Sequence, residues 1–187
     1  MKHTHANIHM KGGLRKASGF ALTELLLALA VVGAVATAGF LVYKSTSSDT
    51  ATDNQINGVV DFIGKSREQF GSSSQWANFS TANVVKLNRV PSQFTIDATA
   101  GSEVLYDAHK TAVTLTAAAT AGTAQFSTAS QPECSKLGQR VSDLADTLQA
   151  GPTGTLQTVK SPSQPFDITK LATGCSGASP VIKVTMQ

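Results

Sequence analysis

The sequence predicts an α+β protein, in which a long N-terminal helix carries a head built around an antiparallel β-sheet. Three observations lead to this class. An apolar run over residues 20–43 is followed by apolar residues at helical spacing up to Phe70. Beyond this point the chain consists of short β-branched segments separated by glycine and proline. Cys134 and Cys175 lie far apart in this second part and are expected to close its C-terminal region.

The first 19 residues form a basic leader. They hold 4 of the chain's 15 Lys and Arg residues and no Asp or Glu, which leaves 11 basic against 12 acidic residues in the rest. The pI of about 9.0 therefore comes from the leader, and the charge argues against a nucleic-acid partner. Three histidines of the leader are expected to lie in a solvated tail and not in a metal site: His3, His5 and His9.

Residues 20–43 are predicted to form the membrane half of the long helix. As a helix they would measure roughly 36 Å, which is enough to cross a bilayer, and Glu24 is their one charged residue. The basic residues before the run predict that residues 1–19 lie in the cytoplasm and that the chain after Lys44 lies outside.

Residues 44–70 are predicted to continue the helix as an amphipathic half, so that one helix runs from Leu22 to about Phe70. Charged residues alternate there with apolar residues at helical spacing, which are Ile56, Val59, Val60, Ile63 and Phe70. Residues 71–187 are then the globular head.

The head is expected to contain four strands, a short helix and a closing strand. The strands are predicted over residues 84–90, 94–98, 103–106 and 111–117, the helix over 134–148, and the closing strand over 181–186. Three segments are expected to be loops that carry the protein's outside contacts: Gly71–Asn83, Ala118–Pro132 and Gly151–Pro165.

The two cysteines are predicted to form one structural disulfide, Cys134–Cys175. This prediction depends on export, because disulfides persist in oxidising compartments. The alternative is a pair of unrelated buried thiols. Trp76 is expected to be a core or subunit-contact anchor, and His109 an exposed loop residue.

Glu24 stands inside an apolar run, where a carboxylate costs a few kcal/mol in lipid unless it finds a partner. No cation of the chain lies at that depth. Cleavage between Gly19 and Phe20 would create one, since Phe20 would then carry a free α-amino group. If neighbouring helices are staggered, that amine meets Glu24 of another copy and fixes the register of the two helices.

The segment Gly19-Phe20-Ala21-Leu22-Thr23-Glu24 resembles the processing site of type IV pilin precursors and of the related pseudopilins. The resemblance implies a pilin fold, cleavage after Gly19 by a prepilin peptidase, N-methylation of Phe20 and a role for Glu24 in assembly. It also implies a homopolymer that serves adhesion, aggregation or conjugation. Its further partners would be an assembly ATPase, an inner-membrane platform and an outer-membrane secretin.

The layout of the head is similar to that of the type IVb subgroup, and the leader is long, as in that subgroup. Phe20 departs from the subgroup, in which another apolar residue often begins the mature chain. The implied location is the inner membrane, with a single span and a periplasmic C-terminus before assembly, and then the extracellular fibre.

Two alternatives to a major pilin remain open at this point. The chain could be a minor pilin or a type II secretion pseudopilin. It could also be a soluble periplasmic binding protein, cut by ordinary signal peptidase after Ala36 or Ala38. No nucleophile beside a base, phosphate loop or metal-ligand spacing is present in the sequence, so we predict neither an enzyme nor a cofactor. Asp143 and Asp146 are expected to lie on a solvated helix face.

Overall fold

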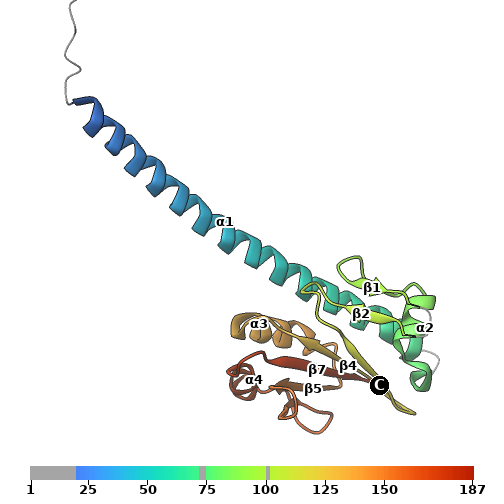
Figure 1. Cartoon of the computed structure of the whole chain (residues 1–187). Helices are drawn as coiled ribbons and strands as arrows, with labels where there is room; N and C mark the ends of the chain where they lie inside the picture. Colours follow the sequence, from blue (N-terminus) through green and yellow to red (C-terminus); the bar gives the residue numbers. More distant parts are fainter. Residues whose placement is uncertain (1–19, 72–74, 100–101) are drawn as a thin grey trace, which may run out of the picture. The chain divides into compact units, whose positions relative to one another are not determined.

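The computed structural model describes residues 20–71, 75–99 and 102–187 (Figure 1). The predicted leader, residues 1–19, lies outside them. The chain divides into two compact units, Met1–Thr46 and Ser47–Gln187.

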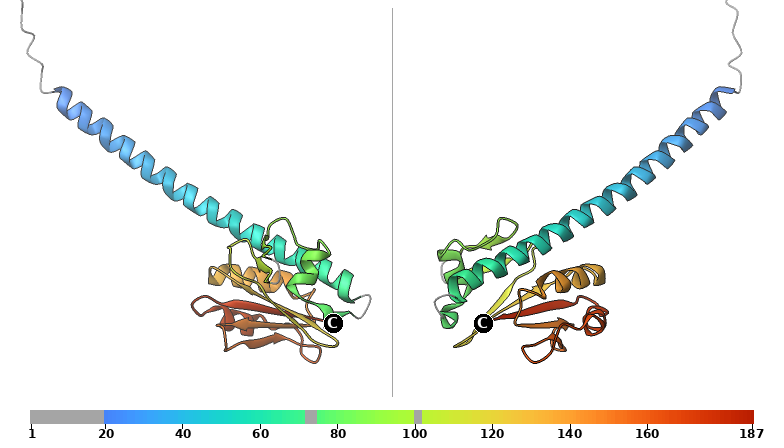
Figure 2. Two further views of the ribbon diagram at one scale, coloured as in Figure 1. Left: turned by 45° about the vertical axis from the view of Figure 1, so that its right-hand side comes forward. Right: turned by 180° about the vertical axis from the view of Figure 1, so that it is seen from behind.

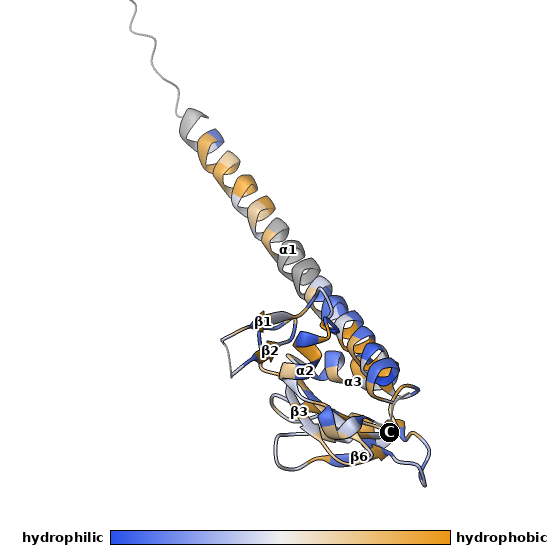
Figure 3. Cartoon of the chain, turned by 90° about the vertical axis from the view of Figure 1, so that its right-hand side faces the viewer, coloured by the Kyte–Doolittle hydropathy of each residue, from blue (hydrophilic) through white to orange (hydrophobic). Residues whose placement is uncertain are grey.

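Helix α1 runs from Phe20 to Ser66 and is followed by a π-helical turn, η1, at Arg67–Gly71. In the first unit the described side chains of α1 are mostly apolar (Figure 3). Among the described residues, no helix offers a stretch that is both long and apolar enough to cross a membrane. The predicted span over residues 20–43 falls partly on side chains outside the description, so it stays a prediction.

The second unit is built on a five-stranded antiparallel sheet with the strand order β3-β4-β7-β5-β6 (Figure 1). The strands are β3 (Thr114–Ala117), β4 (Gly122–Ser127), β5 (Thr147–Gly151), β6 (Gln157–Lys160) and β7 (Val181–Met186). The central strand β7 pairs on both sides, and its Val184 and Ile182 are fully buried. The predicted α+β class is therefore confirmed, as is the closing strand.

Helices cover the sheet. Residues 47–66 of α1 and helix α3 (Gln131–Val141) lie over one side of it (Figure 2). Helix α4 (Ile168–Cys175) packs against α3 and beside strands β5 and β6. The apolar positions predicted for this part of α1 lie in the core, since Ile56, Val59 and Ile63 are at most 6% exposed.

Aromatic side chains form the part of the core that lies against the end of α1. Phe62 contacts Phe126 of β4 edge to face, with ring centroids 5.9 Å apart, and Phe79 at 6.3 Å. Trp76 stacks on Phe70 at 6.1 Å and is 2% exposed, so it is a core anchor. A short helix η2 (Trp76–Asn78), helix α2 (Thr81–Lys86) and the hairpin of β1 (Thr95–Asp97) and β2 (Val104–Tyr106) complete the second unit.

The strand predicted over residues 84–90 is wrong, because this segment begins as helix α2. The hydroxyl of Ser80 accepts a hydrogen bond from the amide of Asn83 at 3.3 Å, which caps the helix. Val84 is fully buried as a helical residue. A local cap thus outweighed the β preference of its valines.

Three further predictions for the head need correction. The loop expected at Ala118–Pro132 contains the inner strand β4, and the loop at Gly151–Pro165 contains strand β6. The helix predicted over residues 134–148 ends at Val141, and β5 occupies its last part. Small residues explain the first error: Gly122 lies against the ring of Trp76, where an added Cβ would be 2.5 Å from a ring carbon.

Candidate functional site

Glu24 lies on the exposed surface of α1, about one helical turn after the helix begins at Phe20. The large apolar side chains around it are between 57% and 69% exposed: Leu25, Leu26, Leu27, Leu29, Val31, Val32, Val35 and Phe40. Because successive helical residues are rotated by about 100°, Leu25, Leu26 and Leu27 point to different sides of the helix. Glu24 is thus an exposed carboxylate at the start of a helix surface that is apolar all round.

The predicted processing site is the bond between Gly19 and Phe20. Gly19 lies outside the described residues, and Phe20 is the first residue of α1. Cleavage between them and methylation of Phe20 therefore stay predictions.

The predicted Cys134–Cys175 disulfide is confirmed. It joins helices α3 and α4, with the two Cα atoms 5.7 Å apart and both residues fully buried. The helices touch closely beside it, since a Cβ on Gly138 would lie 2.5 Å from a methyl carbon of Leu171. The crosslink spans a sequence separation of 41 residues, for which loop-closure entropy corresponds to about 4 kcal/mol.

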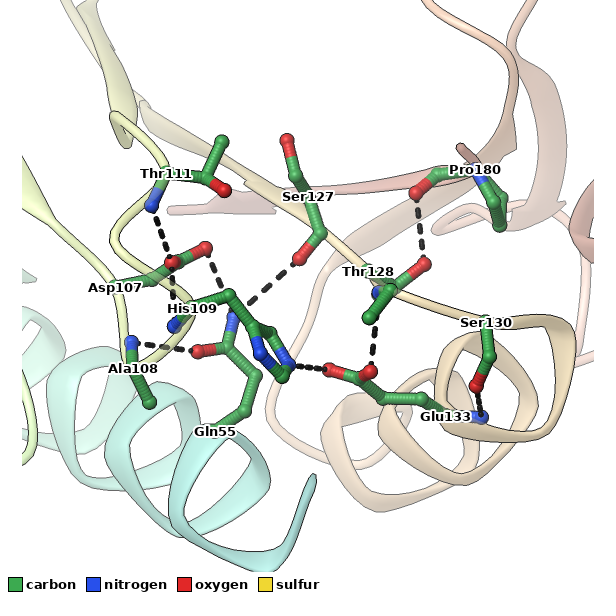
Figure 4. Close-up of polar contacts among 11 residues, drawn as sticks. Gln55, Asp107, Ala108, His109, Thr111, Ser127, Thr128, Ser130, Glu133 and Pro180 are labelled. Atoms are coloured by element: carbon green, nitrogen blue, oxygen red, sulfur yellow. Dashed lines mark hydrogen bonds and ion pairs between the residues drawn. The ribbon is translucent and has the colours of Figure 1, made fainter. Parts of the chain in front are cut away.

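A polar network connects α1 to the turn between β2 and β3 (Figure 4). At its centre Asp107 is 1% exposed. Its Oδ1 accepts hydrogen bonds from the amides of Thr111 at 2.9 Å and His109 at 3.0 Å, and its Oδ2 accepts one from Gln55 Nε2 at 3.1 Å. Gln55 Oε1 in turn accepts a hydrogen bond from the amide of Ala108 at 2.9 Å. One buried glutamine thus holds the turn against the helix.

Burial raises the pKa of the Asp107 carboxyl above its ordinary value. The hydrogen bonds from Thr111, Gln55 and His109 and the charge of the His109 ring lower this pKa, but they only partly offset the loss of solvent. Asp107 is therefore a carboxyl group whose ionisation works against the folded state.

A second buried carboxylate lies at the start of α3. Glu133 is 1% exposed, and its Oε1 lies 2.6 Å from His109 Nε2 while its Oε2 accepts a hydrogen bond from the amide of Ala129 at 3.0 Å (Figure 4). The prediction that His109 is an exposed loop residue is therefore wrong, since its side chain is 20% exposed and paired. The partner lies 24 residues away, and no local pattern indicates such a contact.

The start of α3 does carry a sequence signal that could have been used. Ser130 caps the helix by accepting a hydrogen bond from the amide of Glu133 at 3.4 Å, and Pro132 stands in the first turn. A serine followed three residues later by glutamate is the capping-box pattern. This pattern would have placed the start of the helix correctly and marked Glu133 as a residue of its first turn.

The prediction that Asp146 lies on a solvated helix face is also wrong. It lies beyond the end of α3, at the start of β5, and its carboxylate pairs with Arg67 after α1. It also accepts a hydrogen bond from the amide of Gln187 at 2.8 Å. Asp143 is exposed, as predicted, but it too lies beyond α3. Asp146 thus connects η1 to the end of the central strand.

The head also has a shallow cleft of about 310 Å³ between α1 and α3. Its lining is mainly polar and of mixed charge: Asp53, Ile56, Asn57, Lys136, Gln139 and Arg140. Within residues 20–71, 75–99 and 102–187, no three His, Cys, Asp or Glu side chains gather where a metal ion could bind. The conspicuous features of the described chain are therefore the apolar helix surface with Glu24, the crosslinked helix pair and the buried polar network.

The sequence matches no protein-family model and no curated protein.

Proposed function

We propose that this chain is a structural subunit of a type IV pilus, of the type IVb subgroup. In this proposal it is cleaved after Gly19 by a prepilin peptidase, methylated at Phe20, and polymerised through its N-terminal helix into an extracellular filament. The observation that carries the proposal is Glu24, an acid placed at the start of an exposed apolar helix surface.

In this proposal the charge of Glu24 sets the register between neighbouring copies. A carboxylate that enters an apolar core is costly unless an opposite charge meets it there. Removal of the leader gives each copy a positive α-amino group at Phe20. When this amine of an incoming copy reaches Glu24 of a copy already assembled, both charges are paired and the axial register of the two helices is set.

The exposed leucines and valines supply the driving force for assembly. Burial of one such side chain stabilises by about 1.5–3 kcal/mol. Eight large apolar residues between Leu25 and Phe40 are more than half exposed, so packing between several copies can bury a large apolar area. Before assembly the same surface would lie in the inner membrane.

The head gives the subunit its stability outside the cell, where a disulfide between α3 and α4 persists. The work of extraction from the membrane belongs to a separate assembly ATPase and its membrane platform. A secretin would form the exit through the outer membrane. The proposed products are fibres that act in adhesion, aggregation or conjugation.

The N-terminal sequence of the exported protein tests the processing step. A mature chain that begins at Phe20 supports the proposal. A chain that begins at Thr37 or Gly39 would instead indicate ordinary signal peptidase and a released periplasmic protein, and would refute it.

Replacement of Glu24 by alanine tests assembly. We expect Glu24→Ala to leave cleavage within about twofold of wild type but to lower the yield of sheared filaments at least tenfold, because the amine of Phe20 loses its partner. Asp53→Ala is the matched control, since Asp53 is an exposed acid on the same helix outside the apolar surface. Equal filament yield from the two variants would contradict the role of Glu24.

A further inference from the structure

The two edges of the five-stranded sheet differ in how they are protected. At one edge, β6 is covered by the chain that follows it: the amide of Asp167 donates a hydrogen bond to the carbonyl of Val159 at 3.0 Å. Lys160 ends this strand, and Pro162 and Pro165 follow. The pairing of β6 with β5 is also interrupted by a register shift. Lysine, proline, irregular pairing and a covering segment are the usual means by which proteins block an edge strand.

The opposite edge, β3, contains no lysine, no proline and no register shift, and strand β2 pairs only with the residues before it, through the hydrogen bond from the amide of Val113 to the carbonyl of Leu105 at 2.8 Å. Its four residues pair with β4 in continuous register from Thr114 with Gln125 to Ala117 with Gly122. In the described part of the chain, no group outside β4 forms a hydrogen bond with residues 114–117. The outward N–H and C=O groups of this strand are therefore available to another strand.

The side chains of β3 also favour pairing. Thr114, Thr116 and Ala117 are exposed, and Leu115 is half-buried on the side of the core. Residues 111–132 contain no Asp, Glu, Lys or Arg, so no charge opposes the approach of a second uncharged strand. Threonine, which is β-branched, fits well into a pleated surface.

We propose that β3 is a self-pairing edge, at which β3 of a second copy of this chain adds in antiparallel orientation. A second copy satisfies the chemistry because an antiparallel pair of identical strands is two-fold symmetric, and each residue of β3 then faces an uncharged residue among residues 111–120 of the other copy. At the β6 edge, the same arrangement would bring a charged Lys160 from each copy into the contact. The contact joins the sheets of two heads into one sheet.

Combined with the proposed function, on which this step rests, the symmetry decides where such a contact can form. Copies along one polar filament follow one another head to tail, which is a heterologous arrangement. A two-fold contact therefore joins copies in different filaments. Pairing at β3 thus makes filaments associate side by side, independently of the helix that holds each filament together.

Lysine substitution tests this consequence. We expect Thr116→Lys to leave the amount of filament protein within about twofold of wild type and to lower the fraction of laterally associated filaments at least fivefold in electron micrographs. Gln157→Lys is the matched control, because it places the same charge on an exposed residue of the protected edge. Lateral association of Thr116→Lys at the wild-type level would overturn the proposal.

Single cysteines test the pairing itself on the purified full chain in detergent, whether or not filaments form. In a two-fold antiparallel pair, the numbers of facing residues have a constant sum. Facing residues also lie on the same face of the sheet, so this sum is even and a single position faces itself. Thr114→Cys, Leu115→Cys, Thr116→Cys and Ala117→Cys, made one at a time, should therefore give crosslinked dimers at only one of the four positions. Gln157→Cys should give only background.

The outcomes separate the two proposals. Crosslinks at β3 without any filament would refute the pilus and keep the pairing. Filaments without a position-specific crosslink would refute the pairing and keep the pilus. Equal crosslinking at all four positions would indicate random collision, and crosslinking in cells to a different polypeptide, with none in the purified chain, would indicate another partner; both results overturn self-pairing.

Discussion

Asp107 connects the turn before β3 to helix α1, and its burial makes the ionised form of its carboxyl group less favourable. Its carboxylate orders the turn before β3 through two backbone amides, while Gln55 brings it to α1. Removing the group from water raises its pKa, so its neutral form is favoured in the folded state. The same side chain therefore organises the turn and makes the stability of the head depend on pH.

The direction of that pH dependence can be predicted. A carboxyl group whose pKa is raised by folding contributes stability that is fully present below its unfolded pKa, near 3.8, and is lost as the pH rises through the folded pKa. Asp107→Asn removes this contribution. We therefore compare the free energies of unfolding of wild type and variant. The difference, wild type minus variant, should fall as the pH rises above about 3.8. Its total decrease should be about 1.4 kcal/mol for each pH unit by which folding raises the pKa of Asp107.

Urea unfolding of both proteins between pH 3.5 and pH 7 measures this difference. Asp143→Asn is the control, because Asp143 is exposed in the same unit. Parallel curves for wild type and Asp107→Asn over the whole range would contradict the prediction.

Residues of the polar network were difficult to predict for a physical reason. His109 and Glu133 meet only because the β2–β3 turn and the start of α3 lie side by side in the folded head. Their contact depends on tertiary packing, which no period or spacing in the sequence expresses. The disulfide could be predicted because the chain offers Cys134 no partner other than Cys175.

At the scale of elements, close contact between α4 and β5 depends on Gly174. A Cβ at this position would lie 2.5 Å from the carbonyl oxygen of Ala150, a backbone atom that can move only with its strand. We expect Gly174→Ala to lower the free energy of unfolding by about 1–3 kcal/mol through overpacking.

Gly64 supplies the matched control. It lies in α1 with nothing within 4 Å of an added Cβ, so Gly64→Ala should raise the free energy of unfolding by about 0.5–1 kcal/mol through the better helix propensity of alanine. Chemical denaturation of the two variants compares them directly. Equal changes of the same sign would contradict the proposed contact.

Helices α3 and α4 also depend on their crosslink. Cys134→Ser with Cys175→Ser should lower the free energy of unfolding by about 2–5 kcal/mol, because the unfolded chain is no longer constrained. The corresponding double alanine variant separates this effect from the burial of two hydroxyl groups. A midpoint of urea unfolding unchanged in both variants would show that the crosslink adds no stability.

The sequence predicts an element correctly where its local residue pattern agrees with the way the element packs in the folded head. The closing strand Val181–Met186 alternates and is flanked by Pro180, and its predicted bounds match those observed. Strand β4 reads as a loop because it begins with glycine, threonine and alanine, of which Gly122 lies under Trp76 and Phe79. Helix α4 was not predicted, although Asp167 caps it through the amide of Thr169 at 2.9 Å.

At the scale of the whole molecule, the two units differ in whether their large apolar residues are buried or exposed. The second unit encloses most of its large apolar residues in a continuous core, whereas the first exposes the described leucines and valines of α1. The exposed apolar surface lies in residues 25–37 and at Phe40, next to Glu24. Exposed contiguous apolar surface of this kind is found where a protein meets a membrane or other chains.

This contrast predicts how the full chain behaves when detergent is removed. We expect particles of low mass in micelles and large assemblies after dilution below the critical micelle concentration, while the circular dichroism of the head is unchanged. Light scattering after size-exclusion chromatography measures the mass. Lysine at positions 26 and 29 should reduce the assembly, and a monodisperse monomer of the wild-type chain without detergent would contradict the prediction.

The position of the crosslink has a consequence for the order of maturation. Both sulfur atoms lie in a sealed part of the head, beside the contact of Leu171 with Gly138. An oxidant can reach them only before α3 and α4 close, so bond formation precedes the final packing of the two helices. Afterwards a reductant reaches the bond only when the two helices separate. The rate of reduction therefore measures how often α3 and α4 open locally.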